Sequence, residues 1–278
     1  MTDIRTILIT GATDGLGRAL ATSLAADGAQ LILHGRSRDK LDRVAAEIAQ
    51  ANDGHAPATL LADLADLKQV RDLADQVASL TGHLDVLVNN AGIGSGEPEG
   101  RTRRVSADGY ELRFAVNYLA GFDLTLRLLP LLKASPAARI VHVASIGQHP
   151  IDFDDVMLEH NYSGTRAYGQ SKLAQITAGF VLAERLAPGA ITVNSLHPAT
   201  YMPTKMVLDE IGHSVDTLEE GEAATRRLIN APELATTTGR FFDRVRESRA
   251  HASAYDPETR RRLWRLSLDL SGAPDPPP

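Results

Sequence analysis

Short runs of β-branched and leucine residues alternate with longer amphipathic segments along most of the chain, and this alternation constrains the fold most. The short runs are almost continuously apolar, which is typical of strands in a parallel sheet covered on both faces. They are Ile4–Thr10, Gln30–His34, Ala58–Ala62, Leu84–Asn89, Arg139–Ser145 and Ala190–Leu196. The longer segments have helical spacing: Leu16–Asp27, Arg38–Ala51, Leu67–Leu80, Asp108–Lys133 and Arg166–Leu186. Strand–helix alternation of this kind predicts right-handed crossovers and a doubly wound α/β sheet.

No proline- or glycine-rich linker divides the 278 residues, so we expect one domain over residues 1–272 and a disordered tail over 273–278. The chain has no cysteine, which excludes disulfides, thiolate metal ligands and a cysteine nucleophile. Its nine histidines are scattered without metal-ligand spacing, so no metal is expected.

The formal net charge of −6 at pH 7 argues against a nucleic-acid partner. We see no apolar run near the ~20 residues that span a bilayer and no leader before the first strand, so we expect a cytoplasmic protein without membrane attachment.

A glycine-rich turn, TGATDGLG at residues 10–17, joins the first strand to the following helix. Glycines at such a turn allow close backbone approach to a pyrophosphate, and the helix then offers its N-terminal amides to that anion. A plain βα turn is the alternative, and the strand before and the helix after the turn favour the phosphate site. The cofactor contacts expected here are Gly11, Thr13, Asp14, Gly15, Leu16 and Gly17.

The end of the second strand bears on the choice between NAD and NADP. A carboxylate at this point would bind the adenosine ribose of NAD and repel a 2′-phosphate. Gly35 stands where that carboxylate belongs, and Arg36 and Ser37 follow it. Because a guanidinium fork suits a phosphate, the sequence predicts NADP, although Arg36 on its own is also consistent with a solvated side chain.

Two further strand ends supply candidate cofactor contacts at the same edge of the sheet. Asp63 and Leu64 follow the third strand, where a carboxylate can face an adenine amine. Asn90, Ala91 and Gly92 form a small polar turn after the fourth strand, beside the expected cofactor ribose. Either segment is also consistent with ordinary turn or capping chemistry.

Tyr168 and Lys172 are the candidate proton-transfer pair. They are four residues apart on a predicted helix, so their side chains share a face. A neighbouring ammonium and a positive cofactor ring favour the phenolate, so we expect the pKa of Tyr168 to be lowered and the phenol to act as acid or base near neutrality. An amphipathic stripe is the alternative interpretation. Tyr162 has Arg166 at the same spacing, but arginine lacks the compact ammonium that suits ribose hydroxyls.

Two more polar residues stand where a reaction needs them. Ser145 ends the fifth strand, where a hydroxyl can bind a substrate oxygen over the cofactor. Asn117 lies in the middle of a predicted helix, an unfavourable place for asparagine, which indicates a polar role there. A buried amide that bonds to nearby backbone is the alternative for Asn117.

Together these motifs resemble the short-chain dehydrogenase/reductase superfamily. The resemblance covers nearly the whole chain and shows, in order, TGxxxGxG, NNAG, the helical Asn, the strand-end Ser and YxxxK. It implies a Rossmann fold and a catalytic tetrad of Asn117, Ser145, Tyr168 and Lys172. The resemblance also implies their roles: Tyr168 donates the proton, Ser145 polarises the carbonyl, Lys172 holds the nicotinamide ribose and tunes the phenol, and Asn117 holds a water in the proton relay.

A finer similarity is to the retinol-dehydrogenase/protochlorophyllide-reductase-like branch, which tends to use NADP. It is carried by residues 108–117 (DGYELRFAVN), 163–173 (SGTRAYGQSKL) and 261–267 (RRLWRLS). Pro198 and Thr200 are the expected cofactor contacts after the sixth strand. This sequence departs from the family pattern at Ala199, where the family usually has glycine, and that departure leaves the course of the following loop open.

Two irregular stretches, residues 146–165 and 198–219, begin at the carboxyl edge of the sheet, where ligands bind in such folds. They are rich in apolar side chains: Ile151, Phe153 and Met157 in the first, and Tyr201, Met202, Met206, Val207, Leu208 and Ile211 in the second. A mobile apolar segment beside a catalytic edge can close over a ligand, so we expect a bulky apolar carbonyl or alcohol substrate. These residues can also serve only to anchor the segment to the core.

The sequence therefore predicts an NADP-dependent oxidoreductase that interconverts an alcohol and a ketone or aldehyde by hydride transfer. Two alternatives stay open: reduction of an activated C=C bond, and an NADP-sensing protein without catalysis, against which the intact tetrad argues. The resemblance also suggests a homo-oligomer that pairs through the helices over 108–133 and 166–186. However, Phe122, Leu126 and Leu129 can equally face the sheet of their own subunit.

Overall fold

The computed structural model describes residues 4–96, 102–187 and 189–276. Its strands form one sheet in the order β3-β2-β1-β4-β5-β6-β7-β8. Every neighbouring pair is parallel except β7 and β8, which are antiparallel. The strands are β1 (Thr6–Ile9), β2 (Gln30–Gly35), β3 (Ala58–Leu61), β4 (Val86–Asn89), β5 (Arg139–Val143), β6 (Thr192–His197), β7 (Arg240–Asp243) and β8 (Arg246–Ser248). The structure confirms the predicted doubly wound sheet.

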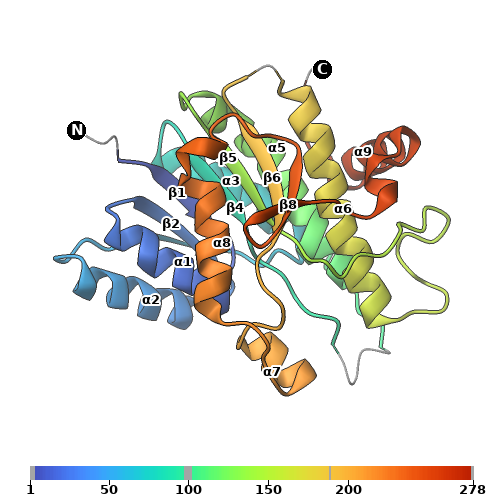
Figure 1. Cartoon of the computed structure of the whole chain (residues 1–278), viewed down its shortest axis with the longest axis horizontal. Helices are drawn as coiled ribbons and strands as arrows, with labels where there is room; N and C mark the ends of the chain where they lie inside the picture. Colours follow the sequence, from blue (N-terminus) through green and yellow to red (C-terminus); the bar gives the residue numbers. More distant parts are fainter. Residues whose placement is uncertain (1–3, 97–101, 188, 277–278) are drawn as a thin grey trace.

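Helices cover both faces of the sheet, as Figure 1 shows. One face carries α1 (Gly15–Ala26), α2 (Arg38–Ala51) and α8 (Leu218–Asn230), which enclose one buried apolar cluster. The other face carries α3 (Leu67–Leu80), α5 (Ala120–Lys133), α6 (Gly164–Arg185) and α9 (Pro257–Ser271), which enclose a second. Strands buried between two helical layers must be apolar on both sides, which explains the continuous apolar runs of the sequence.

The helix expected over residues 108–133 is divided in three. It begins at Leu112, where the carboxylate of Glu111 accepts from the Phe114 amide, and runs through α4 (Leu112–Phe114), the π-helical turn η1 (Ala115–Leu119) and α5. A π-turn inserts one residue into a helix and often marks a functional site. This one contains Asn117.

Three elements near the C-terminal end of the chain were not predicted. β7 (RFFD) and β8 (RES) are short and carry little apolar pattern, and all three residues of β8 are exposed. Helix α9 begins at Asp256, whose carboxylate accepts from the Thr259 amide, and has proline in its first turn. It ends at Gly272, in the left-handed conformation that glycine tolerates best.

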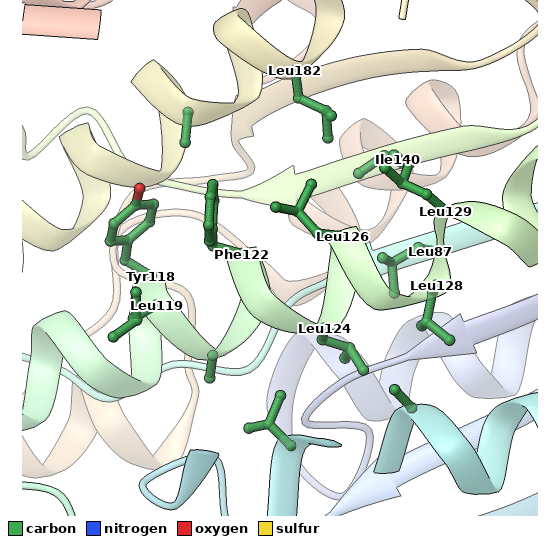
Figure 2. Close-up of a cluster of buried hydrophobic side chains, with 14 of the residues drawn as sticks. Leu87, Tyr118, Leu119, Phe122, Leu124, Leu126, Leu128, Leu129, Ile140 and Leu182 are labelled. Atoms are coloured by element: carbon green, nitrogen blue, oxygen red, sulfur yellow. The ribbon is translucent and has the colours of Figure 1, made fainter. Parts of the chain in front are cut away.

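Helix α9 packs on α5 and α6 through Trp264. The indole stacks edge-on against Phe122 with ring centroids 5.1 Å apart, and the Arg185 guanidinium lies 4.6 Å from the indole centroid. Figure 2 shows Phe122 and Leu126 beside Leu182 of α6 within the same apolar cluster. The apolar positions that pairing between subunits would need therefore face elements of their own subunit.

The tail makes contacts that correct the expectation of disorder for its described residues, 273–276. The indole N–H of Trp264 donates to the Asp275 carboxylate at 2.9 Å, and Arg185 pairs with the same carboxylate at 2.8 Å. The sequence of the tail gave no sign of these contacts because their partners belong to α9 and α6. Residues 277–278 lie outside the described residues.

One helical stretch among the described residues, Leu112–Lys133, is long and apolar enough to cross a membrane by length and composition alone. Its mean hydropathy is 1.2 and 72% of it is buried inside the protein. The expectation that no stretch reaches this length was therefore wrong. The composition follows from the position of the helix, because Leu124 and Leu128 are almost completely buried in the core.

We expect Trp264→Ala to lower the free energy of unfolding by about 3–5 kcal/mol, the range for deleting a buried large aromatic side chain. Trp264→Phe keeps most of the packing and loses the hydrogen bond to Asp275, so about 1 kcal/mol is expected. Urea unfolding followed by circular dichroism measures both, since Trp264 is the single tryptophan and its fluorescence is lost in the variants. A loss of less than about 1 kcal/mol in Trp264→Ala would show that α9 is not part of the cooperative core.

Candidate active site

The glycine-rich turn passes too close to the turn after β4 to admit side chains. Gly11 has φ +68°, and a Cβ there would lie 2.8 Å from the Cα of Ala91. A Cβ on Gly17 would lie 2.2 Å from the Gly11 carbonyl oxygen and 2.6 Å from the Asn90 amide nitrogen. Glycine is thus required here by close packing, which leaves the backbone and the N-terminus of α1 bare. Leu16, by contrast, is buried in the core beneath the turn.

Hydrogen bonds lock this turn to β4. The Thr10 hydroxyl accepts from the amides of Asn90 and Ala91 at 3.0 and 3.1 Å. The Asn90 side-chain amide donates to the carbonyls of Thr10 and Gly11 at 2.8 and 3.1 Å. The predicted contacts on these two turns are therefore brought together at one edge.

The end of β2 lies against the same turn. A Cβ on Gly35 would lie 2.5 Å from the Thr13 methyl, so any carboxylate-bearing residue at this position would displace the turn. Arg36 is exposed, and its guanidinium has no ion pair among the residues that the structure describes. Ser37 precedes α2 without a side-chain capping bond, so its hydroxyl is left for another partner.

Asp14 and Asp63 take part in local structure at this edge. The Asp14 carboxylate accepts from the Gly15 amide at 2.8 Å and lies 3.3 Å from the Lys40 ammonium. The Asp63 carboxylate accepts from the Ala65 amide at 2.9 Å. Leu64 is buried in the core, so its side chain supports the edge from below.

Ser145, Tyr168 and Lys172 come together where β5 ends and α6 begins. The Gly147 amide donates to the Ser145 hydroxyl at 3.0 Å, and that hydroxyl lies within hydrogen-bonding contact of the Tyr168 phenol. The Lys172 ammonium donates to the Val143 carbonyl at 2.9 Å and lies 5.8 Å from the centroid of the Tyr168 ring. The structure thus groups three of the four residues expected in the tetrad.

The protonation of this group differs from the sequence-based expectation. Burial raises the pKa of Tyr168 above its ordinary value, the Ser145 contact opposes the rise, and the negative charge of Glu210 adds to it. Burial also lowers the pKa of Lys172 to about 8. The expectation of a lowered Tyr168 pKa was wrong for the protein alone, because desolvation of the phenol outweighs the Ser145 contact that favours the phenolate. The phenol is therefore protonated at neutral pH.

Asn117 completes the set from the π-turn. Its amide oxygen accepts from the Ile93 amide at 2.8 Å, and its amide nitrogen donates to the Ile93 carbonyl and the Ser171 hydroxyl, both at 3.1 Å. A Cβ on Gly92 would lie 3.3 Å from the Asn117 oxygen and 3.5 Å from the Lys172 nitrogen. Asn117 therefore bonds to nearby backbone, the alternative left open by the sequence, and does so beside Lys172.

At the start of the loop after β6, Pro198 and Ala199 are buried. The next residue, Thr200, holds the loop by hydrogen bonds. The Thr200 amide donates to the Asp216 carboxylate at 2.6 Å, and its hydroxyl accepts from Arg244 at 3.1 Å. Arg244 also pairs with Asp216. Ala199 is 5% exposed and fits beside α8, so alanine at this position is accommodated by packing.

The middle of this loop forms a short helix, α7 (Lys205–Ile211), that extends away from the rest of the fold in Figure 1. Its N-terminal end lies over the glycine turn, since a Cβ on Gly15 would be 2.8 Å from the Thr204 methyl. Its C-terminal end reaches the segment after β4 through Glu210, which accepts from the amides of Ser95 and Gly96. We call residues 200–216 the lid.

The apolar residues expected at the site divide into two groups. None of the residues of α7 is buried, and Met206 and Leu208 are 38% and 46% exposed. Met202 instead packs under α8, because a Cβ on Gly221 would lie 2.2 Å from its sulfur. The three insertion residues expected near the mouth pack on the core: Ile151, Phe153 and Met157.

Sequence reasoning missed a group of charged residues around the entrance, of which Glu111 and Arg113 are buried. They are Glu111, Arg113, Asp216, Glu210 and Arg244. In the sequence, Glu111 and Arg113 are only an acidic and a basic residue two positions apart near the start of a helix. The described parts of the chain hold no group of three or more His, Asp or Glu side chains that could bind a metal ion.

One edge of the sheet carries the glycine turn, the end of β2 without a carboxylate, and the Tyr168–Lys172 pair. This arrangement fits a phosphorylated dinucleotide whose reacting ring lies near Tyr168. Glycines at three contact points leave room for backbone–phosphate approach that a Cβ would fill.

Residues 5–211 match the short chain dehydrogenase family. The chain is 34% identical over 289 residues to human retinol dehydrogenase 13, which covers 98% of this chain and 86% of the relative. It is 35% identical over 282 residues to a protein of Streptomyces sp. (strain C5) provisionally named daunorubicin C-13 ketoreductase, covering 96% and 93% of the two chains.

Among solved structures, a short-chain dehydrogenase from Escherichia coli CFT073 in complex with NADPH superposes with a TM-score of 0.69. It is 28% identical and covers 86% of this chain and 95% of its own. Together with the family match and the site geometry, these similarities confirm the resemblance seen in the sequence: the chain belongs to the short-chain dehydrogenase family, in its retinol-dehydrogenase-like branch, and is an oxidoreductase.

Proposed function

We propose that the protein is an NADPH-dependent reductase of bulky apolar ketones or aldehydes, able to run in reverse as an alcohol dehydrogenase. The observation that carries the proposal is the group of Ser145, Tyr168 and Lys172 at the sheet edge that also carries the bare glycine turn. This edge supplies a proton donor, a hydroxyl for the substrate oxygen and a cradle for a dinucleotide within one site.

The end of β2 supports NADP as the cofactor. Gly35 leaves no space for the carboxylate that would select NAD, and the exposed Arg36, which has no ion pair with any described residue, can offer its guanidinium to a 2′-phosphate. The Escherichia coli relative of known structure was solved with NADPH. When bound, the cofactor supplies or accepts the hydride, and the chain's own residues handle the proton.

The raised pKa of Tyr168 supports reduction as the favoured direction near neutral pH. A phenol kept protonated by burial can give its proton to a carbonyl oxygen that is gaining charge. The Ser145 hydroxyl, oriented by the Gly147 amide, is placed to hydrogen-bond that same oxygen. Lys172, with its pKa lowered to about 8, supplies a compact cation beside the phenol and the cofactor ribose.

The lid supports a bulky apolar substrate. The exposed Met206 and Leu208 belong to a helix that spans from the glycine turn to the segment after β4, so they stand at the entrance. The two relatives described above are named as a retinol dehydrogenase and, provisionally, as a daunorubicin C-13 ketoreductase. A cytoplasmic location belongs to the same proposal.

Tyr168→Phe keeps the ring and its packing but removes the acid, so kcat should fall by about 10²–10⁴-fold. Binding of NADPH, followed by fluorescence titration, should stay nearly unchanged. Tyr110→Phe is the matched control, because it also loses one hydroxyl and one hydrogen bond, to the Leu270 carbonyl, far from the site. More than about a tenth of the wild-type kcat remaining in Tyr168→Phe would remove this residue from the mechanism.

Arg36→Ala should weaken NADPH binding by about 1.5–3 kcal/mol, the range for a hydrogen bond to a charged group. NADH lacks the 2′-phosphate, so its affinity should hardly change. Arg43→Ala, an exposed arginine on α2, is the control for loss of general positive charge. Isothermal titration of the wild type and both variants with NADPH and with NADH measures these affinities. Equal losses for the two cofactors in Arg36→Ala, or wild-type preference for NADH, would refute the NADP assignment.

Met206→Ala should reduce kcat/KM for large apolar ketones by about 5–30-fold and leave small ketones nearly unchanged, because about 1–2 kcal/mol of apolar contact is lost only when the ligand reaches the lid. A series of ketones graded by size, assayed by NADPH oxidation, tests this. Leu80→Ala removes a comparably exposed apolar residue, 48% exposed, at the far end of α3. A kcat/KM that does not rise with ligand size in the wild type would contradict the apolar pocket.

A further inference from the structure

The lid is held across the site entrance by one carboxylate. The carboxylate of Glu210 accepts three hydrogen bonds from the segment after β4: from the Ser95 amide at 3.0 Å, the Ser95 hydroxyl at 2.8 Å and the Gly96 amide at 2.9 Å. A Cβ on Gly94 would lie 2.1 Å from that carboxylate, so glycine is needed for it to seat. Both carboxylate oxygens of Glu210 accept a hydrogen bond from this segment, although none of the residues of α7 is buried.

The receiving segment is itself held rigid from behind. Arg113 donates to the carbonyls of Gly94 and Ser95 at 2.7 and 2.6 Å, which turns the amides of Ser95 and Gly96 outward toward the lid. The same guanidinium donates to the Tyr162 hydroxyl at 2.5 Å and lies 3.5 Å from the Glu111 carboxylate. Arg113 is 7% exposed and Glu111 is 1% exposed, so these hydrogen bonds are almost completely shielded from water. A buried polar network whose members are all paired holds its segment in one conformation.

The carboxylate also acts on the proton donor. The groups that face Tyr168 are Ser145 from the end of β5, Lys172 from its own helix α6, and Tyr201 and Glu210 from the lid. The negative charge of Glu210 disfavours the phenolate and so raises the pKa of Tyr168. One side chain therefore connects the closed position of the lid to the protonation of the catalytic phenol.

We propose that Glu210 is a positioning residue that latches the lid onto the Ser95–Gly96 amides at the entrance to the site. This inference rests on the proposed reductase function for its kinetic consequences only. Its structural half, the latch, holds whatever the substrate is. Opening the latch lets a substrate in, and closing it excludes water and brings a negative charge toward the phenol.

Glu210→Gln is the informative variant because it keeps the size of the side chain and removes the charge. An amide has one acceptor oxygen, so it cannot receive both the Ser95 and Gly96 amides on separate oxygens as the carboxylate does. Asp209→Asn is the matched control: it removes the same charge from the same helix, at a residue whose carboxylate pairs with Lys205. Glu210→Asp, with its charge kept and its reach shortened, separates loss of charge from loss of the latch.

Amide hydrogen exchange of the protein without substrate tests the latch. In Glu210→Gln, exchange of the lid and of the Ser95 and Gly96 amides should be about tenfold faster or more, as expected for losing one charge-assisted hydrogen bond. In Asp209→Asn it should stay as in the wild type. Unchanged exchange in Glu210→Gln would refute the latch, and this readout does not depend on catalysis.

The pH dependence of kcat/KM tests the effect of the Glu210 charge on Tyr168. Reduction needs protonated Tyr168, so activity is lost as pH rises through the pKa of Tyr168. Removing the negative charge lowers that pKa, so in Glu210→Gln the loss of activity should move to lower pH, with a KM for the large ketone raised about tenfold. Glu210→Asp should lose activity at the same pH as the wild type. Asp209→Asn should keep both this pH and the KM for the large ketone. An unchanged pH dependence in Glu210→Gln would refute this effect of the Glu210 charge. A wild type that is inactive on every carbonyl would refute the proposed function and leave the exchange result standing.

Discussion

The site depends on the close approach of two turns at the carboxyl edge of the sheet. The Thr10 hydroxyl and the Asn90 amide hold the turn after β1 against the turn after β4, and Gly11 permits the contact because it has no side chain. From there the packing continues to Gly92, whose missing side chain leaves room for Asn117 and Lys172. The cofactor cradle and the proton-transfer group are thus fixed relative to each other by close packing at glycines and by hydrogen bonds of the short side chains of Thr10 and Asn90.

Burial then determines which protonation states this edge can use. Desolvation lowers the pKa of Lys172 to about 8, raises the pKa of Tyr168, and lowers the pKa of His142, beneath the site on β5, to about 4. His142 is therefore neutral at physiological pH and adds no competing cation near Lys172. The packing that buries the phenol therefore also keeps it in its acid form.

The sequence predicted the parts of the structure that repeat a local pattern. Strands β1 to β6 and the glycine turn follow from apolar runs and glycine spacing, and the positions of Ser145, Tyr168 and Lys172 follow from one strand end and one helix face. The direction of the Tyr168 pKa shift did not follow, because it depends on how much chain covers the phenol. Glu210 could not be found either, since its partners lie 115 and 114 residues earlier in the chain. Met202 and Met157 were placed wrongly because loop composition does not say which way a side chain turns.

Helix α9 joins parts of the chain that are made at very different times. Phe122 and Trp264 are in contact across a long stretch of sequence, and the α5–α6 surface that α9 covers is apolar. During synthesis from the N-terminus, the sheet and its first helices can form while this surface is still exposed to water. The hydrophobic core on that side is closed only when α9 has emerged from the ribosome, so the time between these two events is when the nascent protein is most exposed to aggregation and most dependent on chaperones.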